Sequence, residues 1–355
     1  MKDIKLLEKL SLTAGVPGRE HRVRKLILKE IDGLFDSVTT DPLGSIIAVR
    51  KPRPGKGKKP TRQPKRVMLA AHMDQIGFLV SHVSTEGYAY LVPVGGFDTR
   101  NLFARMVTVC PDPKDPSKDL KAIMNPAGKP IHVASEEERK RIPEVGDFIL
   151  DFGIPAKEVS KKVKIGDMVV LDAPVTHLGD HFIGQAMDNR VACWIAIEAC
   201  RKLRTHAAEI HCVFTVQEEV GLRGAIASSF TVNPDIGIGI DTTLAVDTPG
   251  VPGQDQCSRL GGGAVISVMD GSFIGDYDLV EQFDKIARTK KIKAVRSMMR
   301  RGGTDTGGLQ RMAGGCKALT LSLPTRYIHT ITEMINVKDL RACRDLLTAY
   351  LAEAR

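Results

Sequence analysis

The sequence contains no long hydrophobic run, and nowhere does it approach the roughly 18 consecutive apolar residues of a membrane-spanning helix. This absence argues against a transmembrane protein. The start, Met1-Lys2-Asp3-Ile4-Lys5, also lacks the apolar core and the cleavage site of a secretory signal. We therefore expect a cytoplasmic protein.

Cysteine pairs are missing as well. The seven cysteines are odd in number and scattered, and no two of them form a C-x-x-C pair. This pattern argues against a disulfide framework or a zinc knuckle. Most of the cysteines stand in apolar runs, where cysteine serves as a small buried hydrophobe, so a reducing compartment is consistent with the sequence.

One segment has no acidic residue. Residues 51–66 hold eight of the 51 Lys and Arg residues, together with four prolines, two glycines and no aromatic residue. The formal charge of +9 comes from this segment, because the other basic residues are nearly balanced by the 42 acidic ones. A solvated surface loop is the favoured interpretation and a polyanion contact is the alternative. We expect no nucleic-acid partner.

The chain has 355 residues, a length that suits two domains or one domain with an insertion. Its hydrophobic pattern is of two kinds. In 76–173, short β-like runs are separated by Gly, Pro and charged clusters, which predicts a small β-rich module with a short exposed helix over 135–141. In 1–75 and 174–355, helical and strand patterns alternate. The alternation predicts a discontinuous α/β domain with a mostly parallel sheet sandwiched by helices.

The expected elements of the α/β domain follow from apolar periodicity. Helices are predicted over 6–12, 23–31, 189–203, 222–229, 278–290, 305–313 and 337–354. Strands are predicted over 45–50, 67–71, 210–216, 236–240, 292–298 and 317–323.

Two adjacent carboxylates follow one of these strands. The apolar run 210–216 is followed by Gln217, Glu218 and Glu219, at the carboxyl edge where open α/β sheets bind ligands. Carboxylates beside apolar residues are costly to desolvate. Such a pair is explained if one carboxylate binds a metal ion and the other transfers a proton.

Other strand ends supply further candidates. His72 and Asp74 follow 67–71, Asp241 follows 236–240, His329 lies in the loop after 317–323, and Asp188 precedes a helix. Two imidazoles and several carboxylates without a thiolate suit Zn²⁺, Co²⁺ or Mn²⁺.

Counting the ligands favours two ions over one. His72, Asp188, Glu219, Asp241 and His329 exceed the three protein ligands that a single catalytic zinc usually takes. If Asp188 bridges two ions, each receives three ligands. Glu218 is then free to act as the general base, and Asp74 can hold the other ring nitrogen of His72.

Each position has a simpler explanation when it is taken alone. Asp188 is equally well placed to cap its helix, Asp241 fits a turn, and a single His329 is more often structural than a ligand. The remaining histidines have no comparable setting. The prediction of a metal site therefore depends on the convergence of the whole set.

With these residues in place, the chain resembles the tetrahedral aminopeptidase family, cytosolic dinuclear metallopeptidases that include glutamyl and deblocking aminopeptidases. The matching segments are AAHMDQIGF at 70–78, AMDNR at 186–190, TVQEEVGLRGA at 215–225, IGID at 238–241, GGTDTGG at 302–308 and PTRYIHT at 324–330. The resemblance implies an α/β zinc-peptidase domain interrupted by a β-barrel-like dimerisation domain, with dimers assembling into a hollow dodecamer. The segments 51–66 and 134–146 depart from the family pattern.

The resemblance also implies a role for each matching residue. One metal would be held by His72, Asp188 and Asp241, and the other by Asp188, Glu219 and His329, with Glu218 as the base and Asp74 steering His72. It further implies zinc or cobalt as the cofactor and short peptides, cleaved at the N-terminus, as substrates.

Three other functions remain open from the sequence. Carboxypeptidases and deacylases have the same kind of two-metal site. The long insertion between His72 and Asp188, however, lies earlier in the chain than we expect in that group. A glycosidase also uses paired carboxylates, and relatives have been labelled endoglucanases, but adjacent Glu218 and Glu219 are poorly placed to flank a bond. A non-enzymatic protein that binds a partner through 51–66 would keep the metals only as structure. Structural metal sites are usually closed, whereas here Glu218 is left over beside five ligands, which argues against this alternative.

The preferred N-terminal residue also remains open. Four arginines are candidates to favour an acidic side chain, although a surface position is the more frequent outcome: Arg259, Arg300, Arg301 and Arg326.

Overall fold

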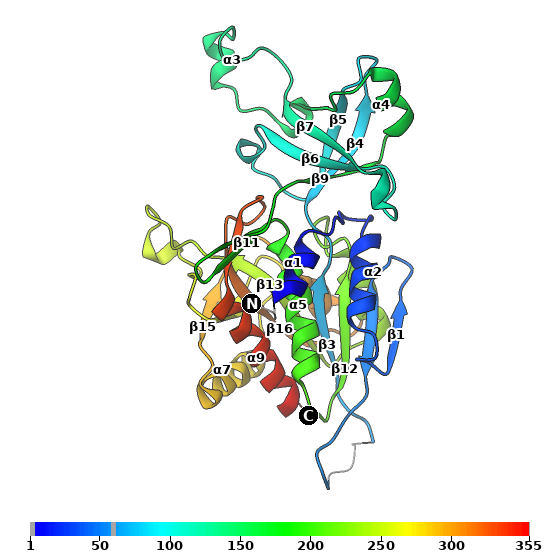
Figure 1. The fold of residues 1–355 in the computed structure, drawn as a ribbon. Coiled ribbons are helices and arrows are strands. Elements are labelled where there is room, and N and C mark those ends of the chain that lie inside the picture. The colour runs from blue at the N-terminus through cyan, green and yellow to red at the C-terminus, as the bar shows by residue number, and fades with distance from the viewer. Residues whose placement is uncertain (1–3, 58–61, 355) are drawn as a thin grey trace.

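The computed structural model describes residues 4–57 and 62–354. In these two ranges the chain forms a large mixed sheet covered by helices, and a closed barrel lies at one end of it (Figure 1). The predicted α/β class with a second, barrel-like unit is thus confirmed. No helix in the described ranges is long and apolar enough to cross a membrane.

The large sheet is parallel at its centre and mostly antiparallel towards its edges. Its main path runs β1-β2-β12-β3-β13-β16-β17-β11-β10, and β14 joins β16 and β15 beside this path. The strands are β1 (Ser37–Thr40), β2 (Ile46–Arg50), β3 (Arg66–His72), β10 (Thr176–Leu178), β11 (His181–Gly184), β12 (Glu209–Thr215), β13 (Ile236–Leu244), β14 (Ala264–Met269), β15 (Ala294–Met298), β16 (Lys317–Arg326) and β17 (Glu333–Asn336).

Parallel pairing joins β12, β3, β13 and β16 with one another and β14 with β15. The other pairings are antiparallel. The predicted parallel sheet therefore describes the centre. The edges differ because tight connections, such as the one between β1 and β2, can join only antiparallel strands.

Helices cover both faces of the sheet. One face packs against α1 (Lys5–Ser11), α2 (His21–Glu30), α5 (Met187–Lys202), α7 (Tyr277–Lys290) and α9 (Val337–Glu353), and the other against α6 (Arg223–Val232) and α8 (Asp305–Arg311). Every helix and strand predicted for the α/β domain is present. β3 shows why its sequence is apolar throughout: Leu69 faces the core on one side and Met68 the core on the other.

The barrel is made of antiparallel strands in the order β4-β5-β8-β7-β6-β9. They are β4 (Gly77–Val83), β5 (Ala89–Val94), β6 (Arg105–Cys110), β7 (Leu120–Pro126), β8 (Phe148–Asp151) and β9 (Met168–Leu171), accompanied by α3 (Glu136–Lys140) and α4 (Ala156–Lys162). Phe78 and Phe148 are fully buried in its own core. The predicted short exposed helix is α3, where Ser135 and Glu138 form a capping box.

The basic segment 51–66 lies partly outside the described residues, because 58–61 are not described. Within the described part, Arg53 exchanges main-chain hydrogen bonds of 3.0 and 2.9 Å with His206. The surface-loop prediction for 58–61 therefore stays a prediction.

Candidate metal centre

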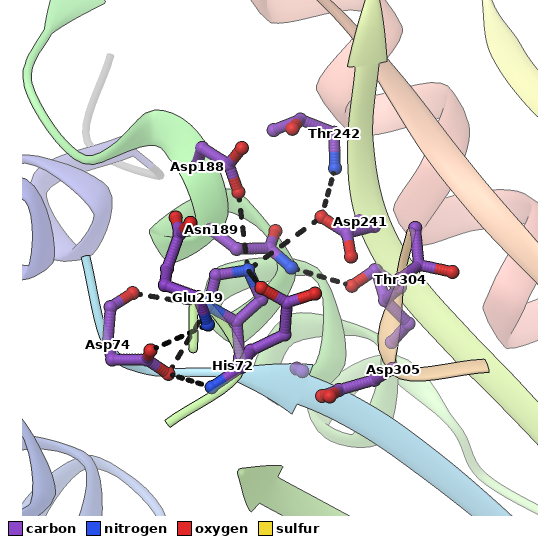
Figure 2. Close-up of polar contacts among 12 residues, drawn as sticks. His72, Asp74, Asp188, Asn189, Glu219, Asp241, Thr242, Thr304 and Asp305 are labelled. Atoms are coloured by element: carbon purple, nitrogen blue, oxygen red, sulfur yellow. Dashed lines mark hydrogen bonds and ion pairs between the residues drawn. The ribbon is translucent and has the colours of Figure 1, made fainter. Parts of the chain in front are cut away.

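The predicted site residues meet at the carboxyl edge of the central strands. His72 ends β3 and pairs in register with Thr215, the last residue of β12, so the turn after β12 brings Glu218 and Glu219 next to it. Asp241 lies in β13, the neighbour of β3 on its other side. Asp188 comes from the start of α5 and His329 from the loop after β16. Figure 2 shows His72 between the carboxylates of Asp74 and Asp188.

Three sets of side chains have ligand atoms within 4.8 Å of one another. They are His72 with Asp188 and Asp241, Asp188 with Glu219 and His329, and His72 with Glu218 and Glu219. The first two sets are the two ligand groups expected from the sequence, and Asp188 belongs to both.

The distances between these atoms fit ligands that share an ion. Nε2 of His72 is 3.3 Å from Asp188 Oδ1 and 3.9 Å from Asp241 Oδ1. Nε2 of His329 is 3.6 Å from Asp188 Oδ2 and 3.5 Å from Glu219 Oε2. Two atoms bound at about 2.1 Å to one tetrahedral ion lie about 3.4 Å apart. The two oxygens of Asp188 thus face two different histidines.

Asp74 does more than was expected of it. Its carboxylate oxygen lies 3.5 Å from His72 Nδ1, while its main-chain oxygen is closer, at 3.2 Å. The two carboxylate oxygens accept the main-chain N–H groups of Glu218 and Glu219 at 3.1 and 3.2 Å. Asp74 therefore fixes the turn that carries both glutamates, in addition to lying against His72.

Glu333 was not identified from the sequence. It begins β17, is 2% exposed, and accepts the N–H of His329 at 2.7 Å and the N–H of Asp188 at 3.1 Å. One carboxylate therefore holds the main chain of two candidate ligands from distant segments. Burial, together with the charge of Asp188, raises the pKa of Glu333 to about 8.

Glu20 and Asp305 were also missed as site residues. Glu20 precedes α2 and accepts the N–H of Gln217 at 3.1 Å, where the chain takes a left-handed conformation (φ 55°) just before Glu218. Asp305, inside the quoted GGTDTGG segment, accepts a hydrogen bond from the Thr215 hydroxyl. An acidic residue in an apolar setting is the only signal the sequence offers for such groups, because their main-chain partners are set by the tertiary structure.

Acidic side chains are concentrated at this edge, and few basic side chains pair with them. In the described part of the chain, Asp188, Glu218, Glu219 and Asp241 form ion pairs only with His72 and His329. Burial and neighbouring carboxylates raise the pKa of Glu218 and of Asp241 well above the usual range. Although burial lowers the pKa of His329, Glu219 and Asp188 raise it to about 9.

The donor set fits a divalent cation. Glu219 Oε1 is buried and has no hydrogen-bond partner in the described structure. Imidazole nitrogens and carboxylate oxygens, with no thiolate among them, suit Zn²⁺, Co²⁺ or Mn²⁺. A cation here would compensate the buried negative charge.

A cavity of about 580 Å³ opens over these side chains. Its wall includes Gly96, from the loop after β5 of the barrel, and a Cβ atom at this position would lie 3.7 Å from His329 Nδ1. The barrel thus contributes to the site. Arg301 also lines the cavity, whereas Arg326 is paired with Asp247 at 2.6 Å.

Solved structures share this fold over nearly the whole chain. An aminopeptidase from the archaeon Desulfurococcus kamchatkensis superposes with a TM-score of 0.91 at 31% identity, covering 99% of this chain and 95% of that one. The TET1 peptidase of Pyrococcus horikoshii superposes with a TM-score of 0.84 at 28% identity, covering 99% of each chain. The fold and the site therefore define an aminopeptidase, a hydrolase of peptide bonds.

Comparison of sequences identifies the family within this class of enzymes. A lysyl aminopeptidase of Pyrococcus furiosus is 32% identical over 100% of this chain and 98% of its own length. The sequence model of the M42 glutamyl aminopeptidase family matches residues 52–346, and the chain belongs to this family. The resemblance inferred from the motifs is thus confirmed. M42 peptidases are metal-dependent enzymes.

Proposed function

We propose that this aminopeptidase releases N-terminal residues from short peptides with a water molecule held between two divalent ions, Zn²⁺ or Co²⁺. His72, Asp188 and Asp241 would hold one ion, and Asp188, Glu219 and His329 the other. The ions, when bound, supply Lewis acidity and lower the pKa of a bound water. The observation that best supports two ions is Asp188, whose Oδ1 and Oδ2 face different histidines at 3.3 and 3.6 Å.

Glu218 is the proposed general base. Its carboxylate lines the cavity, 3.8 Å from His72 Nε2, and none of the described residues donates a hydrogen bond to it. Burial and the charges of Asp241 and Glu219 raise its pKa, which makes it a stronger base than an ordinary carboxylate. Glu218 takes the proton of the attacking water and returns it to the departing amine. Asp74, by holding the main chain of Glu218, keeps the carboxylate over the cavity.

Two neighbouring substitutions of the same kind test this division of roles. We expect Glu218→Gln to keep two ions per chain and to lower kcat by about 10²-fold or more. Glu219→Gln should instead lose one ion, because an amide is a poorer ligand than a carboxylate. Metal content measured by elemental analysis, beside hydrolysis of aminoacyl anilides, separates the two. A Glu218→Gln enzyme with full activity would refute the assignment.

The direction of cleavage has its own test, which also addresses the carboxypeptidase, deacylase and glycosidase alternatives. An aminopeptidase should release single residues from the N-terminus of a peptide whose C-terminus is amidated, and it should release none from the C-terminus of the unmodified peptide. The opposite pattern, or turnover of cellulose without turnover of peptides, would contradict the proposal.

We also propose that residues 76–173 form a dimerisation domain and that dimers build a dodecamer in the cytoplasm. The P. horikoshii TET1 peptidase can assemble into a tetrahedron or a large octahedral shell. In the connection between β7 and α3, Ile131 and Val133 are each 66% exposed, which suits a subunit contact. The described cysteines are all free, in keeping with a reducing compartment.

Light scattering tests the assembly. The wild type should have the mass of an assembly, and Ile131→Glu/Val133→Glu should be smaller. The control is Phe230→Glu, which replaces an apolar residue that is 68% exposed on α6, outside the module. A monomeric wild type, or an assembly that the paired substitution leaves intact, would contradict the proposal.

A further inference from the structure

A second cavity, of about 730 Å³, lies between helix α2 and the barrel. The α2 side contributes Arg24 and Lys25, and the barrel side contributes Lys114 from the segment after β6. The two sides are joined by Arg22, which binds Asp119 at 2.7 Å through each of its Nη atoms. We call this hollow the junction cavity. None of the residues of the proposed metal centre lines it.

The junction cavity carries an excess of positive charge. Two of its basic residues are neutralised in place, Arg22 by Asp119 and Lys121 by Asp172, the latter at 2.6 Å. Arg24, Lys25 and Lys114 also line it, and within the described residues none of them has an ion-pair partner. Three uncompensated cations around one hollow favour an anion.

The pKa of His21 is affected by these charges. It lines the same cavity, and burial followed by the charges of Arg24 and Lys114 lowers its pKa. Asp112, the nearby acid, opposes this effect without cancelling it. The contributions of Arg24 and Lys114 agree with the excess of basic side chains around the cavity.

Two residues of the wall also have buried polar atoms without partners. Gln185 is 8% exposed, and its Oε1 accepts no hydrogen bond from the described residues; Nε of Arg22 is likewise buried and unpaired. Because a carboxamide can turn over, Gln185 can offer either its oxygen or its NH₂ group to a ligand. Leu12 and Val170 add apolar surface to the same wall.

We propose that the junction cavity binds a small organic polyanion. The ligand would be a compact phosphate ester or a polycarboxylate, with its charged groups near Arg24, Lys25 and Lys114 and its carbon skeleton against Leu12 and Val170. Gln185 would bond to it at the floor. A ligand in this position touches both units and links the barrel to the α/β part beside the Arg22–Asp119 pair.

Titration calorimetry with tripolyphosphate and, separately, tricarballylate tests the proposal on the full-length protein after metal removal. Metal removal prevents the probes from binding to ions in the catalytic cavity, where four carboxylates outnumber the one arginine, Arg301. We expect saturable binding of one anion per chain with a Kd of about 1 mM or tighter, weakened by added salt. Whichever probe binds more tightly identifies the phosphate or the carboxylate source.

Charge reversal supplies the matched pair of variants. Lys25→Glu/Lys114→Glu should weaken binding about tenfold or more. The control, Lys29→Glu/Lys157→Glu, changes the net charge equally at two exposed lysines outside the cavity, one on α2 and one on α4, and should stay within about twofold of the wild type. If the first pair fails to fold, as judged by circular dichroism, Lys25→Ala/Lys114→Ala replaces it. No saturable binding by the wild type, or equal losses in both pairs, would overturn the proposal.

Discussion

The metal centre and the junction cavity are hollows of similar size and opposite charge. The first, of about 580 Å³, gathers carboxylates whose ion pairs in the described structure are with histidines only. The second, of about 730 Å³, gathers Arg24, Lys25 and Lys114, which have no ion-pair partner among the described residues. Their burial differs sharply. His72 and Asp241 are buried, whereas Lys25 and Lys114 are exposed to water. Since unpaired buried charge is the more costly, the metal centre should depend far more on its counter-ion.

Metal removal is the strongest test of this difference. Chelation should abolish peptide hydrolysis and lower the unfolding temperature by on the order of 10 °C, because each bound ion stabilises the native state by mass action. Re-addition of Zn²⁺ or Co²⁺ should restore both. Removing phosphate from the buffer should leave the unfolding temperature nearly unchanged. Calorimetry and anilide hydrolysis measure the two effects, and a chelated enzyme that stays active would break the comparison.

Glu333→Gln should have the next largest effect. The glutamine oxygen can accept the N–H of His329 or that of Asp188, but its NH₂ group cannot accept the other. One ligand then loses its main-chain anchor, and we expect metal affinity to fall about 10- to 100-fold. Competition with a coloured chelator measures the affinity. Glu137→Gln, on the exposed helix α3, is the control and should leave it unchanged.

Equal affinities in the Glu333→Gln and Glu137→Gln proteins would mean that Glu333 does not position the ligands. A loss of folding, seen as a lower unfolding temperature in both metal-free and metal-loaded protein, would assign Glu333 to stability instead. The metal-loaded protein should therefore be compared with the metal-free one for each variant.

The pH dependence of stability should differ between metal-free and metal-loaded protein. In the folded metal-free chain, the pKa values of Asp305, Glu333 and His329 are about 6, 8 and 9, each above its ordinary value of 3.8, 4.5 and 6.5. Raised values mean that the folded state binds more protons, so the stability from these groups is present at low pH and is lost as the pH rises.

The unfolding temperature of the metal-free protein should therefore fall between about pH 5 and pH 9, on the order of 5 °C or more. Bound ions replace the protons, so the metal-loaded protein should show a smaller slope. Calorimetry across this range measures both. A metal-free protein that is more stable at pH 9 than at pH 6 would show that these carboxylates are not desolvated in solution.

Strands that are buried on both faces are predicted well from the sequence. β3 and β12 are apolar on both faces and end at polar residues, so their positions, and with them His72 and Glu218, follow from the amino acids alone. By contrast, no residue of β1 is buried. Its four residues carry no apolar periodicity, and it was therefore not predicted.

Contacts with the main chain escape prediction for a different reason. Glu20 and Glu333 matter because their oxygens reach particular N–H groups, and these groups come together only after the whole sheet has formed. The start of β14 is similar: Gly261 and Gly263, which precede it, donate to Asp339 of α9 at 2.7 and 2.8 Å, and no strand was predicted there.

The smallest expected effect lies where the barrel meets the metal centre. A methyl group added by Gly96→Ala would lie 3.7 Å from His329 Nδ1, an ordinary contact, so the fold should be kept and KM should rise only a few-fold for bulky N-terminal residues. Its neighbour is the matched contrast. Gly95 has φ +96°, and an added Cβ would lie 2.5 Å from Ile76, so Gly95→Ala should cost about 1–3 kcal/mol of stability. Melting curves and KM values should be measured for both variants. If Gly96→Ala leaves KM unchanged for substrates with small and with bulky N-terminal residues, the barrel loop does not border the substrate. The two units then meet at the metal centre, but only the α/β part contacts the substrate.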